Sequence, residues 1–334
     1  MADAATASSP AGSIRLPAVF RAAGPATGSL IALILLSIYN AFFTTNFLTW
    51  ATLRVNLTQV ATIVLVGVGM TLVIATGGID LSVGALMAIA GCLAPLIFMS
   101  HWGPLDNPWV GITLAIIIPI LVAGVFGLFN GVLVTQFNIQ PIVATLVLFL
   151  GGRGIAGALL HGKLREFNNP NFEFIGQGRV FGIPVQVFMM VVVVAVAAWA
   201  MRSTTFGRYV LATGGNEAAA RLAGVPINKV KLAVYGITGL LSGLAGLIVI
   251  ALNSSADPIN VGLNMELDAI AAAAVGGTIL TGGRATIIGT FIGAALIHQI
   301  RYTLLSHNVA DGTTRMVTAA AIIIAVLIQK RPSS

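Results

Sequence analysis

Residues 56–100, NLTQVATIVLVGVGMTLVIATGGIDLSVGALMAIAGCLAPLIFMS, contain two apolar runs that are separated by a short interruption with two glycines. Each run is close to the length of about 20 apolar residues that an α-helix needs to cross ~30 Å of hydrocarbon. Gly77 and Gly78 break the helical pattern between the runs. This stretch predicts two membrane spans joined by a tight turn.

The rest of the chain has the same composition. Of its 334 residues, 57% are hydrophobic and 8% are charged, whereas soluble domains average about 25% charged residues. This composition excludes a soluble enzyme, a disordered chain and a nucleic-acid-binding protein, because too few charges are available to cover a water-exposed surface. The net charge of +7 is spread along the chain and is typical of the positive-inside bias of membrane proteins. The predicted fold class is an all-α, polytopic membrane protein.

Hydropathy predicts about ten spans, and eight to ten would fit the pattern. The eighth is short and rich in glycine and alanine, which favours a broken or half-depth helix. Residues 1–24 are predicted to be a flexible cytoplasmic tail, and 25–330 a single transmembrane domain. The expected spans lie near 26–47, 56–76, 81–100, 110–136, 141–161, 183–201, 231–252, 267–281, 285–305 and 314–329.

Ten spans place both termini on the same side of the membrane. With the termini in the cytoplasm, the inner segments carry about twice as many Lys and Arg as the outer ones. Two long polar segments stand out, an external one at 162–182 and a basic cytoplasmic one at 202–231. Segments of this length usually have a function, although a plain solvated connection is the competing interpretation.

Several chemical signatures are absent from the sequence. It contains no phosphate-binding G-x-x-x-x-G-K-[ST], no zinc-binding H-E-x-x-H and no G-x-S-x-G nucleophile motif. Cys92 stands alone in an apolar run and is expected to be a packing residue, and the four histidines fall at predicted span ends. We therefore expect no enzymatic activity, no metal site and no cofactor bound by this chain. The spans hold no carboxylate relay, so energy for uphill transport would come from a partner.

The segment 202–231 contains a short helix signal. Asn216 can cap a helix that has Glu217 at its first position, and Gly224 followed by Pro226 provides a stop. One or two turns of small side chains would fit a cleft in a partner protein. The alternative is a helix that lies on lipid headgroups.

Polar residues recur where spans break. Asp80 is placed to cap the next helix through the N–H groups of Ser82 and Val83, and lining a polar path is the functional alternative. A weak echo of residues 76–84 at 281–289 suggests either repeated helix breaks or coincidence. The candidate translocation path consists of Thr76, Gly77, Gly78, Asp80, Ser82, Asn130, Gln140, Glu266 and Asp268.

Three segments together resemble a known family. They are GMTLVIATGGIDLSVG (69–84), GRYVLATGGNEAAARLAGVPINKVKLAVY (207–235) and ELDAIAAAAVGGTILTGGRATIIGTFIGA (266–294). They are similar to the membrane permeases of bacterial ribose-type sugar ABC importers, which include ribose, xylose, galactose and galactofuranose systems. The resemblance extends over about residues 50–330.

The resemblance implies a bacterial inner-membrane assembly. It would contain two permease copies or paralogues, two cytoplasmic ATPase subunits that hold ATP and Mg²⁺, and a periplasmic sugar-binding protein that docks on the outer face. The 216–224 helix would be the coupling helix on the ATPase. The coupling residues would be Gly215, Asn216, Glu217, Ala218, Ala219, Arg221 and Gly224.

The substrate would be a pentose or a hexose. Three other classes compete with this interpretation. They are a permease of a branched-chain amino-acid-type ABC importer, a stand-alone facilitator or ion-coupled carrier, and a non-transporting membrane scaffold.

Overall fold

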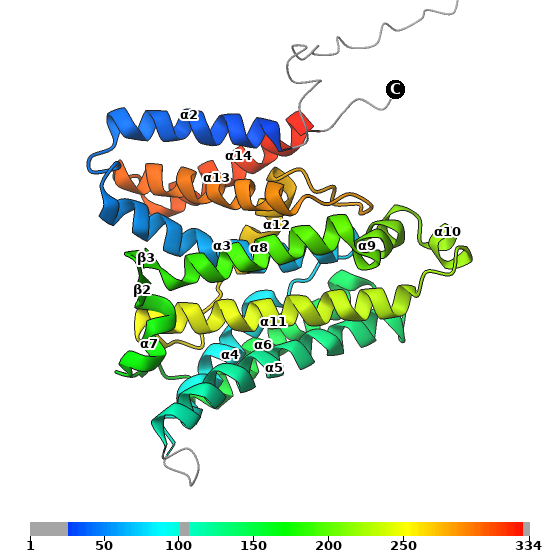
Figure 1. The fold of residues 1–334 in the computed structure, drawn as a ribbon, viewed down its shortest axis with the longest axis horizontal. Helices are drawn as coiled ribbons and strands as arrows, with labels where there is room; N and C mark the ends of the chain where they lie inside the picture. Colours follow the sequence, from blue (N-terminus) through cyan, green and yellow to red (C-terminus); the bar gives the residue numbers. More distant parts are fainter. Residues whose placement is uncertain (1–25, 101–106, 330–334) are drawn as a thin grey trace, which may run out of the picture.

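The structure, a computed structural model, describes residues 26–100 and 107–329, and these residues are almost entirely helical (Figure 1). The predicted tail at 1–24 lies outside the described residues. The helices are α2 (Thr27–Phe43), α3 (Trp50–Ala75), α4 (Val83–Phe98), α5 (Pro108–Thr135), α6 (Pro141–Leu159), α7 (Pro170–Gln177), α8 (Val185–Ser203), α9 (Thr205–Gly215), α10 (Glu217–Leu222), α11 (Ile227–Asn253), α12 (Met265–Val275), α13 (Ile287–Ser306) and α14 (Asp311–Gln329).

Each predicted span overlaps a helix, so the all-α membrane fold is confirmed. Six described helices, α3, α5, α6, α8, α11 and α13, are long and apolar enough to cross a membrane, and α2 and α4 are shorter apolar helices. The count of ten spans stays a prediction. The eighth predicted span is only partly helical, because α12 has 11 residues. At 1.5 Å per residue it covers about 16 Å, roughly half of a hydrocarbon core.

The long helices run side by side, with short elements gathered at the two ends (Figure 1). Helix α11 lies centrally and packs against α3, α4 and α5. Helix α7 and the short strands lie at one end of the bundle, and α10 projects from the opposite end (Figure 1). The start of α2 and the end of α14 lie toward the α10 end, so the described chain begins and finishes on the same side as α10.

Both long polar segments are more structured than the sequence indicates. The segment 162–182 contains α7, whose Phe172 is fully buried against Phe98 and Phe167 at ring-centroid distances of 4.8 and 5.7 Å. It is further held by antiparallel pairs between β1 (Arg165–Glu166) and β4 (Ser255–Ala256), and between β2 (Arg179–Val180) and β3 (Ile183–Pro184).

The segment 202–231, interpreted as the connection between two spans, contains more helix than the predicted one at 216–224. Helix α8 continues to Ser203, α9 and α10 follow, and α11 already begins at Ile227. The physical reason is that polarity marks exposure rather than irregular structure. Helix α9 is amphipathic and buries Val210 and Thr213 against the bundle.

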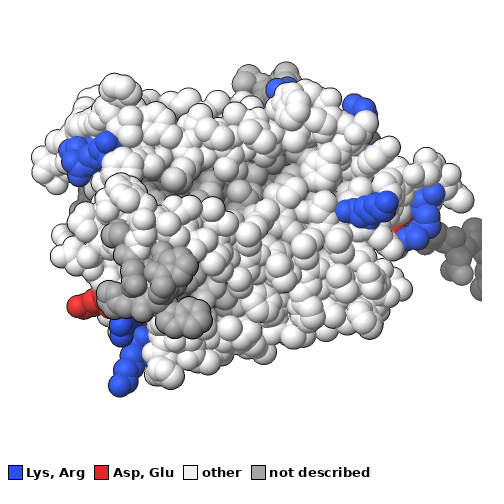
Figure 2. Space-filling view, turned by 60° about the horizontal axis from the view of Figure 1, so that its bottom comes forward, with Lys and Arg blue, Asp and Glu red and all other residues white. Residues whose placement is uncertain are grey.

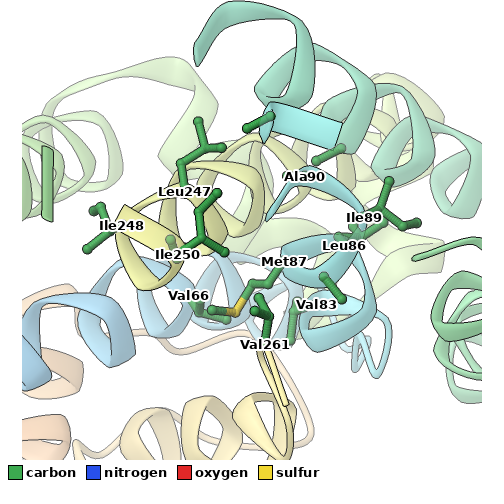
Figure 3. Packing of buried hydrophobic residues seen from close by; sticks show 14 of the residues in the cluster. Val66, Val83, Leu86, Met87, Ile89, Ala90, Leu247, Ile248, Ile250 and Val261 are labelled. Carbon is green, nitrogen blue, oxygen red and sulfur yellow. The ribbon is translucent and has the colours of Figure 1, made fainter. Parts of the chain in front are cut away.

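The core between α4 and α11 depends on close backbone approach. Leu86, Met87 and Ile89 of α4 belong to the same buried cluster as Leu247 and Ile250 of α11 (Figure 3). A Cβ added to Gly246 would overlap the carbonyl oxygen of Met87, so the two backbones touch here without an intervening side chain. Small residues that bring helix backbones together are a common means of association in membranes, where lipid competes for apolar surface.

This contact predicts that Gly246→Ala lowers the free energy of unfolding by about 1–3 kcal/mol, because the added methyl overpacks the α4–α11 interface. Cys92 is fully buried on α4, so a thiol-reactive fluorophore reports when the core opens on heating. Gly151→Ala is the matched control, since nothing lies within 4 Å of its added Cβ. Equal melting temperatures for the two variants would contradict the prediction.

Candidate functional site

Helix α10 has the caps that the sequence predicts. The side-chain oxygen of Asn216 accepts a hydrogen bond from the N–H of Ala219 at 3.0 Å. At the other end Gly224 has φ +80, and the N–H groups of Gly224 and Val225 donate to the carbonyls of Arg221 and Ala220 at 3.1 and 3.0 Å. This pattern is a Schellman motif, which stops a helix after its last turn. Helix formation at 217–222 is therefore encoded locally.

Helix α10 is tied to the bundle by charge. The Glu217 carboxylate lies 2.7 Å from the Lys231 ammonium of α11 and 3.4 Å from the Arg221 guanidinium. The hydrogen bond from Lys231 is the main factor that lowers the pKa of Glu217 below its usual value, so the ion pair is present at neutral pH. Only Ala220 is buried, at 5% exposed. The helix is attached at one side and otherwise stands free of its own chain.

The free face includes a residue that the sequence reasoning missed. Leu222 is 91% exposed, while Ala218, Ala219 and Arg221 beside it are also exposed. The signal in the sequence was an apolar residue directly before the helix stop. The α10 face is therefore a small exposed surface that carries one leucine and one arginine.

A second polar cluster lies at the break between α3 and α4. One oxygen of Asp80 accepts hydrogen bonds from the N–H and the hydroxyl of Ser82 at 2.9 and 2.6 Å. The Asn130 amide of α5 donates to the Ser82 hydroxyl at 2.8 Å. All three side chains are fully buried. The sequence-predicted residues Asp80, Ser82 and Asn130 thus form one hydrogen-bonded chain.

The predicted cap at Asp80 is wrong in part. Its carboxylate accepts hydrogen bonds from Ser82 but none from Val83, and the helix-capping position of α4 is Ser82, whose side chain makes no cap bond. The reason is spacing, since Asp80 precedes the capping position by two residues and forms an Asx turn instead.

Two further residues complete this break. The Thr145 hydroxyl accepts from the N–H of Leu81 at 3.1 Å. The Tyr235 hydroxyl would lie 2.7 Å from a Cβ on Gly78. Buried oxygens of Asp80, Asn130 and Tyr235 have no hydrogen-bond partner within the described protein. Thr145 and Tyr235 come from distant parts of the chain, so local sequence reasoning could not select them.

The other predicted path residues are dispersed. Thr76 donates to the Val73 carbonyl of its own helix at 2.8 Å, and Gln140 is exposed at the start of α6. Glu266 is buried near Gly84 at the start of α4, and Asp268 pairs with Arg301 of α13 at 2.8 and 3.1 Å. The break therefore brings together Asp80, Ser82 and Asn130, while Glu266 and Asp268 belong to the start of α12.

The histidines do not all lie at span ends. His298 is buried inside α13, with its Nε2 2.9 Å from the side-chain oxygen of Asn56 on α3. His298 can be buried within the span because Asn56 on the facing helix gives its ring a polar partner. Within residues 26–100 and 107–329, no three His, Cys, Asp or Glu residues group as metal ligands would.

The fold and these features define a multi-pass membrane protein of the transport-permease class, with buried polar helix breaks and a small docking helix at one end. A family model described as "branched-chain amino acid transport system / permease component" matches residues 52–327. The chain belongs to this family.

Curated relatives match over nearly the whole chain. The ribose import permease protein RbsC of Escherichia coli (strain K12) is 39% identical over 307 residues, covering 91% of this chain and 93% of that protein. The ribose import permease protein of Bacillus subtilis (strain 168) is 37% identical over 323 residues, 96% of each chain. The galactofuranose transporter permease protein YtfT of Escherichia coli (strain K12) is 36% identical over 277 residues, 82% and 78% of the two chains. No solved structure gives a significant match.

The Asp80 network predicts different effects for two substitutions. Asp80→Leu leaves the N–H and hydroxyl of Ser82 without an acceptor and should cost about 1–3 kcal/mol of stability. Asp80→Asn keeps one acceptor oxygen and should cost less than about 1 kcal/mol. The Cys92 melting assay measures both. A melting temperature for Asp80→Asn as low as that of Asp80→Leu would contradict the network, whereas normal stability with lost transport would assign Asp80 to the path.

Proposed function

We propose that this chain is the transmembrane subunit of a bacterial ABC importer and moves a monosaccharide from the periplasm to the cytoplasm. The observation that carries the proposal is the match to ribose and galactofuranose permeases over most of both chains. Another relative is also named for a sugar. The fructose import permease protein of Bifidobacterium longum (strain NCC 2705) is 33% identical over 316 residues. The family description names branched-chain amino acids, so an amino-acid substrate is the second candidate.

Energy reaches this chain through α10. The proposed coupling residues Gly215, Asn216, Glu217, Ala218, Ala219, Arg221 and Gly224 belong to one short capped helix and its ends. Its attachment through Glu217 and Lys231 supports this role, because a docking helix has to transmit force to the bundle. Leu222 joins the proposed set as the apolar anchor. ATP and Mg²⁺ bind the partner ATPase, and this chain itself catalyses no reaction.

The α10 end faces the cytoplasm in this proposal, together with both chain termini. The face in view in Figure 2 supports a membrane-spanning orientation along the long axis, since most of its Lys and Arg lie toward the two ends with an uncharged surface between them. The opposite end, with α7 and the segment 162–182, receives the loaded binding protein. The aromatic anchoring of α7 supports this role, because a docking surface gains from being ordered in advance.

The helix breaks supply the polar part of the translocation path. Buried oxygens without a partner at Asp80, Asn130 and Tyr235 support this assignment, since a passing sugar hydroxyl would satisfy them. A second permease, either a copy or a paralogue, completes the path. The scattered polar groups favour passage over tight binding, which leaves selection to the binding protein.

The two ends can be tested against each other. Leu222→Asp should weaken binding of the ATPase subunit by at least about tenfold, because a charge replaces the exposed apolar anchor. Phe181→Asp is the matched variant, since Phe181 is 97% exposed at the α7 end. This substitution should weaken docking of the periplasmic binding protein and leave the affinity for the ATPase subunit unchanged. Affinities are measured with the permease in nanodiscs, and ATPase binding unaffected by Leu222→Asp would refute α10 as the docking helix.

The substrate is tested with the reconstituted importer. The chain is co-expressed with the ATPase and binding protein encoded beside it, and ATP hydrolysis in nanodiscs is measured with ribose, xylose, galactose, fructose and arabinose. We expect one sugar-loaded binding protein to stimulate hydrolysis severalfold. Stimulation by leucine or valine alone would establish the amino-acid alternative. Sugar flux through the chain without any ATPase would make the protein a facilitator.

A further inference from the structure

The sequence Thr-Gly-Gly occurs at three places that the fold brings into contact. Residues 76–78 follow α3, residues 213–215 close α9 directly before α10, and residues 281–283 lie between α12 and α13. More than 60 residues separate each copy from the next along the chain. The name "glycine junction" is used below for these three segments, of which 213–215 is the last turn of helix α9.

The turns meet backbone to backbone. The N–H of Gly283 donates to the carbonyl of Ala75, the last residue of α3, at 3.0 Å. A Cβ on Gly214 would overlap that same carbonyl oxygen and would lie 2.6 Å from the Gly283 nitrogen. A Cβ on Gly282 would lie 2.9 Å from the Gly214 oxygen and 2.9 Å from the Gly77 nitrogen. The segment 281–283 therefore contacts both of the others, and 213–215 reaches the first through Ala75, the residue directly before Thr76.

Gly214, Gly282 and Gly283 leave no room for a Cβ, which would lie within 2.9 Å of backbone atoms of the neighbouring segments. Gly77, Gly282 and Gly283 have φ values of +83, +93 and +75, which L-residues with a Cβ rarely adopt. Gly214 has an ordinary helical backbone, so its requirement is for space alone. Because the contacts involve main-chain atoms and a hydrogen bond, the turns cannot slide past one another by changing side-chain rotamers.

The junction connects the docking helix to two breaks. Thr213 is 2% exposed, so the end of α9 lies buried in the bundle, and its hydroxyl donates to the Tyr209 carbonyl of the same helix at 2.8 Å. Asn216 and α10 follow Gly215 without an intervening loop. The turn at 76–78 leads into the buried Asp80–Ser82–Asn130 chain, and the turn at 281–283 leads into α13.

We infer that Gly214 is a positioning residue for transport, and that the glycine junction shifts the helix breaks at 76–82 and 276–286 together when a partner moves α10. This inference rests on the proposed docking of an ATPase at α10. It assigns Gly214, which is outside the ATPase-contacting set and outside the proposed path, a role in transmitting displacement between them.

The test is hydrogen–deuterium exchange on the full-length permease in nanodiscs, with and without the ATPase subunit. Binding to the wild-type protein should change exchange at least about threefold at 76–78 and 281–284 as well as at 213–224. Residues 257–262, in the connection between α11 and α12, should stay unchanged. A response confined to 213–224 in the wild-type protein would overturn the inference.

Two variants separate coupling from packing. Gly214→Ala should bind the ATPase subunit within about threefold of wild type, while the exchange response at 76–78 and 281–284 is lost. Gly246→Ala introduces a similar backbone overlap between α4 and α11 and should lower stability but keep the response. A full response in Gly214→Ala would overturn the inference. If Gly214→Ala does not fold, the wild-type exchange pattern decides alone.

Failure of the docking proposal gives a different result. If the wild-type chain binds no ATPase subunit, or binds it equally well after Leu222→Asp, the proposed function of α10 fails and the inference falls with it. Binding that depends on Leu222 but leaves both distant turns unchanged rejects the glycine junction alone.

Discussion

The structure depends on one constraint, that each backbone N–H and C=O group inside an apolar bundle must find a partner without water. Helices meet this constraint automatically, but helix breaks do not. Helix α3 ends with the N–H groups of Gly77 and Gly78 donating to the carbonyls of Ile74 and Val73 at 2.9 and 3.1 Å. Helix α12 ends in the same way, with Gly277 and Thr278 donating to Ala274 and Ala273 at 3.0 Å each.

This equivalence gives the echo within the sequence a physical meaning and changes its register. The sequence aligns residues 76–84 with 281–289, but the turn that matches Gly77 is Gly277, which has φ +92 against +83. Both belong to Schellman motifs at the ends of helices inside the bundle. Residues 281–283 instead contact the first break. Glycine-rich sequence therefore occurs both at the helix breaks and in the segments that pack against them. The sequence alone does not distinguish these two structural roles.

Much of the fold could be predicted because its determinants are local. Apolar runs define the helices, and the Asn216 cap and the Gly224 stop define α10 within nine residues. What could not be predicted is long-range. Thr145 and Tyr235 reach the α3–α4 break from helices far along the chain, and the capping assignment of Asp80 was wrong because the α4 start lies two residues further on. Polarity marked 202–231 as a connection between spans, but it did not reveal α9, an amphipathic helix that is stabilised by burying one face.

The exposed Leu222 also bears on the life of the protein before assembly. Under the proposed docking at α10, a newly inserted chain that has not met the ATPase subunit presents a leucine that is 91% exposed at the tip of a polar helix, at the end of the molecule where the described chain begins and finishes. Quality-control proteases and chaperones recognise exposed apolar groups of this kind. In an unassembled copy Leu222 would therefore stay accessible to these proteases and chaperones. Docking of the partner would cover it and so set the amount of permease that persists.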